Sequence, residues 1–118
     1  MTPFEEYCLS LYPEMLRGLT RKPHQSCLSF GFECGQGWHP LLLSLFASLH
    51  PSTTIHQIKE KFGGLRVYAT TTDEGQDLID QAEQRSYSTC ELCGSIENVS
   101  TKGPGWLRTL CEECRQKI

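Results

Sequence analysis

The sequence predicts an α+β fold in which a small antiparallel sheet packs with helices and a four-cysteine module follows near the C-terminal end. Three observations support this class: apolar residues recur at helical spacing in three segments, a glycine pair separates two stretches of strand propensity, and two C-x-x-C pairs occur late in the chain. At 118 residues the chain is too short for two independent cores. We therefore expect a body over residues 1–87 and a module over residues 88–118 that packs on it, forming one cooperative unit.

The N-terminal segment is predicted to begin a helix. Thr2 can serve as the N-cap, Pro3 suits the first helical position, and Glu5 is placed to complete a capping box. Pro13 should end or kink this helix because its ring clashes with the preceding turn. The segment carries acidic residues where a secretory signal would need positive charge, so we expect a cytoplasmic protein.

Two further helices are predicted. Residues 41–49 are apolar nearly all round, which indicates a central core helix that Pro51 terminates. This run is far shorter than the roughly 20 residues needed to span a bilayer, so we expect no membrane partner. From about residue 72 to Tyr87, an apolar side and a polar side predict an amphipathic helix that leads to the cysteine module.

The predicted sheet comes from three stretches. Residues 28–34 alternate large apolar with small or polar residues, which is the period of a half-buried strand. Residues 55–62 and 65–70 flank Gly63-Gly64, and glycine tolerates positive φ at both positions of a tight turn. We therefore expect a strand over 28–34 and an antiparallel hairpin whose turn is Gly63-Gly64.

Four of the seven cysteines form the pattern C-x2-C-x17-C-x2-C. Two residues between cysteines let both sulfur atoms of a tight turn point at one ion, and two such turns complete a tetrahedron with Zn–S distances of about 2.3 Å. Gly94, directly after the first pair, suits the positive φ that such a turn needs. The pattern predicts one structural zinc ion bound by Cys90, Cys93, Cys111 and Cys114.

Redox C-x-x-C pairs and a disulfide are the alternatives. The first would need a thioredoxin-like βαβ setting, which the sequence lacks, and a reducing cytosol disfavours the second. Residues 98–100 and 106–110 can form a short hairpin and the chain after Cys111 looks helical, which favours a treble-clef arrangement over a plain zinc ribbon. Four thiolates close the metal shell, and residues 85–118 contain no histidine for acid–base catalysis. We expect the zinc to be structural.

The other cysteines and histidines form no recognisable catalytic motif, so the chain is not expected to be an enzyme. Cys34, His39 and His50 could combine as nucleophile and base or as a second metal site, but a cysteine at the end of a strand is typically a small core residue. Cys8 lies on the apolar face of the first predicted helix. It is expected to serve packing rather than chemistry.

A candidate binding surface lies on the predicted hairpin. Lys59, Lys61 and Arg66 occur on its two arms and could form a basic patch with Tyr68, as a nucleic-acid surface would. The alternative is a solvated strand face on which Glu60 interleaves with the basic residues. The sequence leaves both interpretations open.

The two tryptophans and the net charge bear on the kind of partner. Trp38 and Trp106 could anchor a partner protein, or Trp106 could simply cover the zinc knuckle. The formal net charge is −3, and four thiolates around Zn²⁺ contribute a further −2, giving about −5 in the metal-bound chain. This charge disfavours binding to phosphate backbones, which rests on neutralising phosphates.

Four segments together resemble a family of small zinc-binding proteins common in tailed-phage and prophage genomes. They are residues 37–42 (GWHPLL), 57–68 (QIKEKFGGLRVY), 89–94 (TCELCG) and 105–111 (GWLRTLC). The resemblance runs from about residue 35 to residue 115, and its most specific string is I-K-x-K-F-G-G-L-R. It implies a phage setting and a zinc fold without implying an activity. The first 34 residues lie outside it and could have a role of their own.

A phage setting makes three classes of function plausible: a binder of a host or phage protein, including an inhibitor of a host defence system; a nucleic-acid accessory factor; and a small enzyme. No catalytic constellation supports the third class. We therefore expect protein binding in the host cytoplasm, with nucleic-acid binding through the zinc module or the basic hairpin as the alternative.

Overall fold

The computed structural model describes residues 1–118 and confirms the α+β class. The α-helices are α1 (Pro3–Leu11), α2 (His39–Ser48), α3 (Asp73–Ser86) and α4 (Glu112–Gln116). The strands are β1 (Phe32–Glu33), β2 (Thr54–Lys61), β3 (Gly64–Thr70), β4 (Val99–Lys102) and β5 (Arg108–Cys111). Three short 3-10 helices are η1 (Arg17–Thr20), η2 (Cys27–Phe30) and η3 (Gln36–Trp38).

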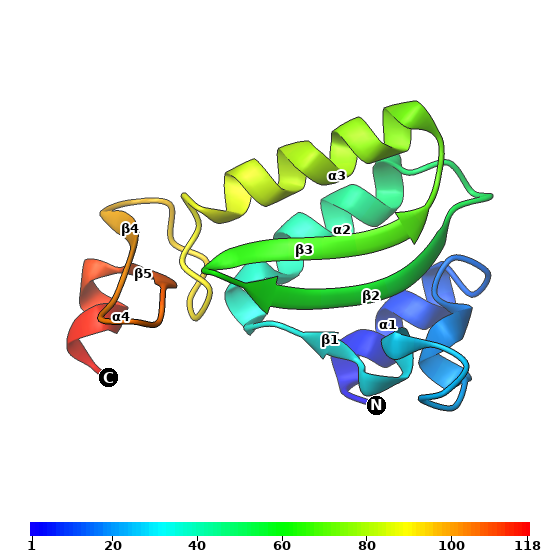
Figure 1. Cartoon of the computed structure of the whole chain (residues 1–118), viewed down its shortest axis with the longest axis horizontal. Helices are drawn as coiled ribbons and strands as arrows, with labels where there is room; N and C mark the ends of the chain where they lie inside the picture. The colour runs from blue at the N-terminus through cyan, green and yellow to red at the C-terminus, as the bar shows by residue number, and fades with distance from the viewer.

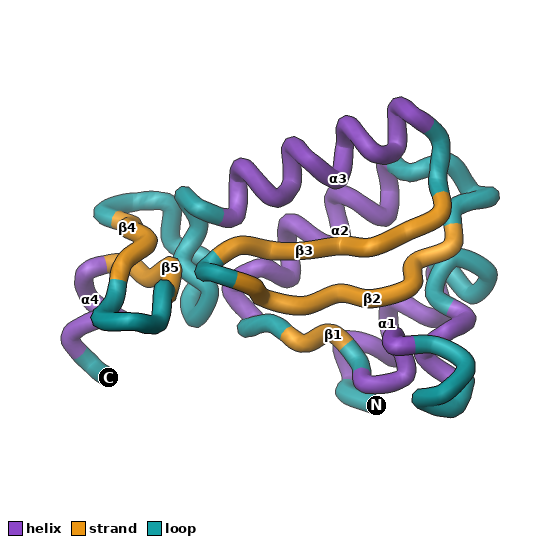
Figure 2. The backbone as a smooth tube through the Cα atoms, viewed as in Figure 1, coloured by secondary structure: helices purple, strands orange, loops and turns teal.

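Two separate sheets organise the chain (Figure 1). The larger has the order β1-β2-β3, in which β1 runs parallel to β2 and β2 runs antiparallel to β3. The smaller consists of the antiparallel pair β4 and β5, which lies beyond the turn that joins β2 to β3 (Figure 2). Helices α2 and α3 contact each other and run alongside the larger sheet.

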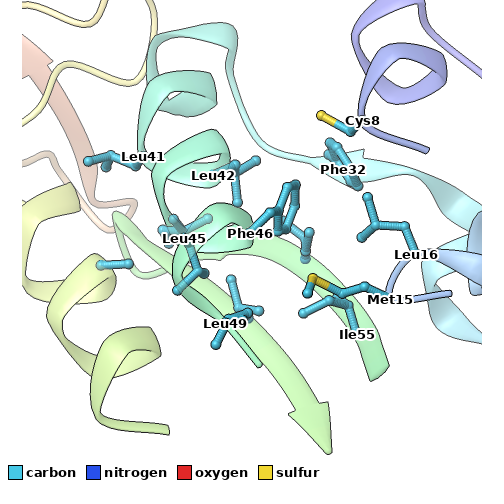
Figure 3. Packing of buried hydrophobic residues seen from close by; sticks show 14 of the residues in the cluster. Cys8, Met15, Leu16, Phe32, Leu41, Leu42, Leu45, Phe46, Leu49 and Ile55 are labelled. Atoms are coloured by element: carbon cyan, nitrogen blue, oxygen red, sulfur yellow. The ribbon is translucent and has the colours of Figure 1, made fainter. Parts of the chain in front are cut away.

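Helix α2 is the centre of the core, as its composition predicts. Leu42 and Phe46 are almost completely buried, and Figure 3 shows Phe46 between Leu42 and the side chains of Met15 and Leu16 from the N-terminal segment. Cys8 is completely buried in the same cluster, which confirms its predicted packing role. None of the α-helices has both the length and the apolar character that crossing a membrane requires.

The capping box at the start of α1 is confirmed. The Glu5 N–H donates to Thr2 Oγ1 at 3.1 Å, and the Thr2 N–H donates to Glu5 Oε1 at 2.8 Å. The helix ends at Leu11, just before Pro13, as predicted. The second oxygen of the Glu5 carboxylate accepts the Phe32 N–H at 2.7 Å. This buried carboxylate therefore joins the start of α1 to strand β1.

The predicted strand over residues 28–34 is wrong for most of its length. The chain forms the 3-10 helix η2 first, and only Phe32–Glu33 pairs with β2. Gly31, with a φ of +87° that favours glycine, caps η2, and the extended chain begins only after it. Leu28 and Phe32 are buried, but Phe30 is 63% exposed. The alternating hydrophobicity arises because Leu28 of η2 and Phe32 of β1 contact the core separately, and not because one strand spans the segment.

The predicted hairpin is confirmed, but its turn lies one residue earlier than expected. Lys61 pairs with Gly64, so the two turn residues are Phe62 and Gly63, with φ values of +55° and +83°. Positive φ at both positions is the type I′ geometry that fits the twist of the strands. Gly64 is the first residue of β3, and a side chain there would collide with the ring of Tyr87. Gly64 is therefore needed for close packing rather than for turn geometry.

Replacing Gly64 with valine should destabilise the protein by about 1–3 kcal/mol, because the new side chain overpacks the space filled by Tyr87. Denaturant unfolding of Gly64→Val in the intact and Tyr87→Ala backgrounds measures this effect. The loss should shrink in the Tyr87→Ala background, since the collision is removed. An equal loss in both backgrounds would show that backbone conformation, not the Tyr87 ring, requires glycine.

Candidate metal centre

The four cysteines of the predicted site lie together in space. Their sulfur atoms are all within 4.8 Å of one another, and the Sγ atoms of Cys93 and Cys111 are 3.7 Å apart. A tetrahedral ion with bonds of about 2.3 Å separates its sulfur ligands by about 3.8 Å, whereas a disulfide needs about 2.05 Å. The cluster could therefore hold a metal ion, in a geometry consistent with structural zinc.

Each cysteine pair is positioned by a different local structure. Cys90 and Cys93 belong to a turn after α3, closed by the Gly94 N–H donating to the Cys90 carbonyl at 2.9 Å. Gly94 has the predicted positive φ, at +83°. Cys111 ends β5 and caps α4, whose first turn carries Cys114. The module therefore contains the elements of a treble clef: a cysteine turn, a hairpin, and a helix that carries the last cysteine. This is the arrangement that the sequence favoured over a plain zinc ribbon.

Backbone N–H groups prepare the Cys90 sulfur atom to carry negative charge. Burial acts to raise the pKa of the Cys90 thiol, but hydrogen bonds from the N–H groups of Cys111, Cys93 and Leu92 outweigh it and lower this pKa to about 6. A hydrogen bond with the Cys111 side chain is the largest of the effects that raise the pKa of Cys114 to about 12. The cluster thus retains protons that a bound divalent cation would displace.

Trp38 joins this cluster to the body, which corrects its predicted surface role. Its side chain is completely buried, and its indole N–H donates to the Thr89 carbonyl at 2.8 Å. The Gly37 N–H donates to the Glu91 carbonyl at 2.7 Å, and the Gly35 N–H donates to Glu91 Oε2 at 2.9 Å. Trp38 cannot anchor a partner because its side chain is completely buried in the main core.

A second contact joins the tip of the larger sheet to the small one. The Thr109 hydroxyl donates to the Gly63 carbonyl at 2.6 Å, and the hydroxyls of Thr101 and Thr109 are 2.6 Å apart. Sequence analysis did not single out these threonines. It also missed that Gly35 and Gly37 approach the Glu91 backbone too closely for a side chain. The G-x-G-W string directly before α2 is the signal that could have shown this close approach.

The remaining residues of the candidate binding surface share one face of the β2–β3 hairpin. Lys59 lies directly opposite Arg66, and strand alternation puts Lys61 and Tyr68 on the same face. Tyr68 is 44% exposed. Arg66 forms an ion pair with Glu83 at 3.4 Å, so its charge is partly neutralised. The structure therefore groups these four residues and separates Trp38 from them.

Cys34 and His39 line a common hollow of ≈ 420 Å³ beside Glu5. Burial, followed by the carboxylates of Glu91 and Glu5, raises the pKa of Cys34 to about 12. Burial also lowers the pKa of His39, whose ring stacks on Phe4 at a centroid distance of 3.8 Å. A thiol with so high a pKa stays protonated near neutral pH, so this pair is poorly suited to nucleophilic catalysis.

Comparison with known proteins gives no match: no family model, no curated protein and no solved structure is similar to the chain. The metal centre therefore rests on the geometry of the chain itself. The resemblance to phage zinc-binding proteins stays a prediction. Its four segments do meet where the module joins the body, since Trp38, Gly63, Glu91 and Thr109 come from one segment each.

Purified protein should contain one zinc ion per chain, and Cys114→Ser should lose it together with much of the module's stability. Metal binding supplies folding free energy on the order of 10 kcal/mol in small zinc domains. Elemental analysis and thermal unfolding measure the two effects. Cys27→Ser is the matched control, because Cys27 is an exposed cysteine outside the cluster. Full metal content in Cys114→Ser would contradict the ligand assignment.

Trp38→Phe should lower the free energy of unfolding by about 1–3 kcal/mol, because the buried Thr89 carbonyl loses its donor. Denaturant unfolding of the metal-saturated protein measures the change. Trp106→Phe is the control, since Trp106 is 73% exposed and its replacement should change stability by at most about 0.5 kcal/mol. Equal effects of the two changes would refute the role assigned to the Trp38 indole.

Proposed function

We propose that this protein is a phage-type binding protein stabilised by structural zinc, which acts by contacting a host or phage protein. The single observation that carries this proposal is an exposed apolar surface where the two sheets meet. Phe62, Trp106 and Leu107 are 66%, 73% and 40% exposed, and they line a hollow of ≈ 520 Å³. We call these three residues the aromatic patch.

The aromatic patch has the chemistry of a protein-binding site. Monomeric soluble proteins rarely expose clustered large apolar side chains, and buried aromatic anchors dominate the binding energy of many interfaces. The patch combines residues from the β2–β3 turn and from the β4–β5 loop. The Thr109–Gly63 hydrogen bond fixes these two segments against each other, so the patch is held in place before a partner arrives.

Charges next to the aromatic patch indicate what the partner carries. The Lys61 ammonium lies 5.6 Å from the centroid of the Phe62 ring. Lys102 precedes the β4–β5 loop and Arg108 follows Leu107, and none of these three cations forms an ion pair. Glu60 is the one acidic residue that lines the same hollow, and its carboxylate accepts the Gly63 N–H at 2.7 Å. An apolar segment flanked by carboxylates would complement this surface.

The net charge favours a protein over a nucleic acid as this partner. A chain of formal charge −3, made more negative by metal-bound thiolates, is poorly suited to neutralising many phosphates. Aromatic side chains beside cations could still stack on single-stranded bases, so binding to single-stranded nucleic acid is the alternative. A protein partner in the host cytoplasm, such as a component of a defence system, fits the predicted phage setting. Catalysis forms no part of the proposal.

Affinity capture from host cells, followed by titration of the captured protein, tests the proposal. Phe62→Asn combined with Trp106→Ser should weaken binding at least tenfold, equivalent to about 1.4 kcal/mol. Asparagine is chosen because it tolerates the positive φ at position 62. Tyr68→Ser is the matched control, since Tyr68 is an exposed aromatic outside the patch, and it should bind normally.

Two results would contradict the proposal. One is capture that the double variant leaves unchanged, which would show that the aromatic patch is not the contact surface. The other is a salt-sensitive affinity for single-stranded DNA or RNA at physiological salt that Lys59→Glu with Lys61→Glu abolishes. That result would establish the nucleic-acid alternative, because removing phosphate contacts weakens such binding and its salt dependence together.

A further inference from the structure

A second hollow, unrelated to the aromatic patch, lies where the segment after α1 meets the start of β2. It occupies ≈ 310 Å³ and is lined mainly by polar side chains: Arg17, Arg21, Gln25, Ser26, Thr54 and His56. In Figure 1 the start of β2 is at the opposite end of that strand from the cysteine module. We call this site the arginine hollow.

The side chains of the arginine hollow offer hydrogen-bond donors that nothing in the chain uses. The guanidinium of Arg21 makes no hydrogen bond or ion pair with the rest of the chain. Gln25 Oε1 accepts the Lys22 N–H at 3.2 Å, which leaves its NH₂ group free. Ser26 Oγ accepts the Leu28 N–H at 3.2 Å, which leaves its hydroxyl proton free. Arg21, Gln25 and Ser26 therefore each offer a free donor to a ligand.

Arg17 is held in a fixed position at the same site. One terminal nitrogen donates to the Glu14 carbonyl at 2.8 Å and the other donates to Thr54 Oγ1 at 2.9 Å. Each terminal nitrogen carries a second N–H, so the group keeps donors after making these bonds. A guanidinium that is already ordered loses little conformational freedom when it binds a ligand.

The electrostatic surroundings favour an anion. Residues 1–84 carry six basic and ten acidic side chains, yet three of the six basic ones are Arg17, Arg21 and Lys22. Residues 15–32 contain no Asp or Glu, and no carboxylate lines the hollow. Positive charge is therefore concentrated in this part of an otherwise acidic body.

We propose that the arginine hollow binds a phosphate group that carries two negative charges, either as free phosphate or as a monoester. Two guanidinium groups balance that charge, and the amide and hydroxyl donors suit a tetrahedral anion with several terminal oxygens. A nucleotide monophosphate and a phosphorylated side chain share this chemistry. A long phosphodiester chain fits less well, because each of its phosphates carries one charge and the site is small.

Titration of the full-length, metal-saturated protein with inorganic phosphate, adenosine monophosphate and phosphoserine tests the proposal. Backbone NMR shifts should move in residues 17–26 and 54–56 and saturate at physiological salt. Arg21→Gln should weaken binding at least tenfold while leaving the fold intact, because the Arg21 side chain makes no internal contact by hydrogen bond or ion pair. The ligand that binds most tightly identifies the source of the phosphate group.

Two further variants sharpen the test. Gln25→Glu keeps the oxygen that accepts the Lys22 N–H but replaces a donor with a negative charge, so it should abolish binding. Lys22→Gln removes the same charge as Arg21→Gln at a residue that does not line the hollow, and it should change affinity less than twofold. Equal losses in Arg21→Gln and Lys22→Gln, or no saturable shifts with any of the three ligands, would overturn the proposal.

Discussion

The packing of the module over residues 88–118 depends on the four sulfur atoms of the cysteine cluster. That part of the chain has almost no hydrophobic core: its buried cluster consists of Cys90, Leu110 and Cys111, and two of these are candidate metal ligands. Burying so few side chains contributes only a few kcal/mol, whereas a structural zinc contributes on the order of 10 kcal/mol. A bound metal ion would therefore take the place of a core in this part of the molecule.

Hydrogen bonds between the module and the body hold distant segments together and so define a surface. Trp38 and Glu91 connect the cysteine knuckle to the segment before α2, and Thr109 connects the small sheet to the turn at Gly63. Because both contacts are short hydrogen bonds at buried or half-buried positions, the β2–β3 turn and the β4–β5 loop keep one relative arrangement. The aromatic patch exists only because these two segments, distant in sequence, are held side by side.

The molecule thus presents two surfaces of different chemistry. The aromatic patch is apolar, is bordered by cations and depends on the position of the cysteine module. The arginine hollow is polar and depends on the ordering of Arg17 against Thr54 at the start of β2. These two sites share no residues, so ligands could occupy them independently. The first 34 residues, which lie outside the resemblance, supply five of the eight residues that line the arginine hollow.

Sequence alone determined the features that depend on neighbouring residues: the capping box of Glu5, the apolar helix α2, the existence of the hairpin and the cysteine spacing. Capping hydrogen bonds and pairs of metal ligands both form between residues a few positions apart, so they leave a pattern in the sequence. Only the tertiary structure decided that Trp38 is buried, that Gly31 interrupts a predicted strand and that Gly64 faces Tyr87. Each of these depends on what distant segments place beside the residue, and hydrophobic periodicity carries no information about that packing.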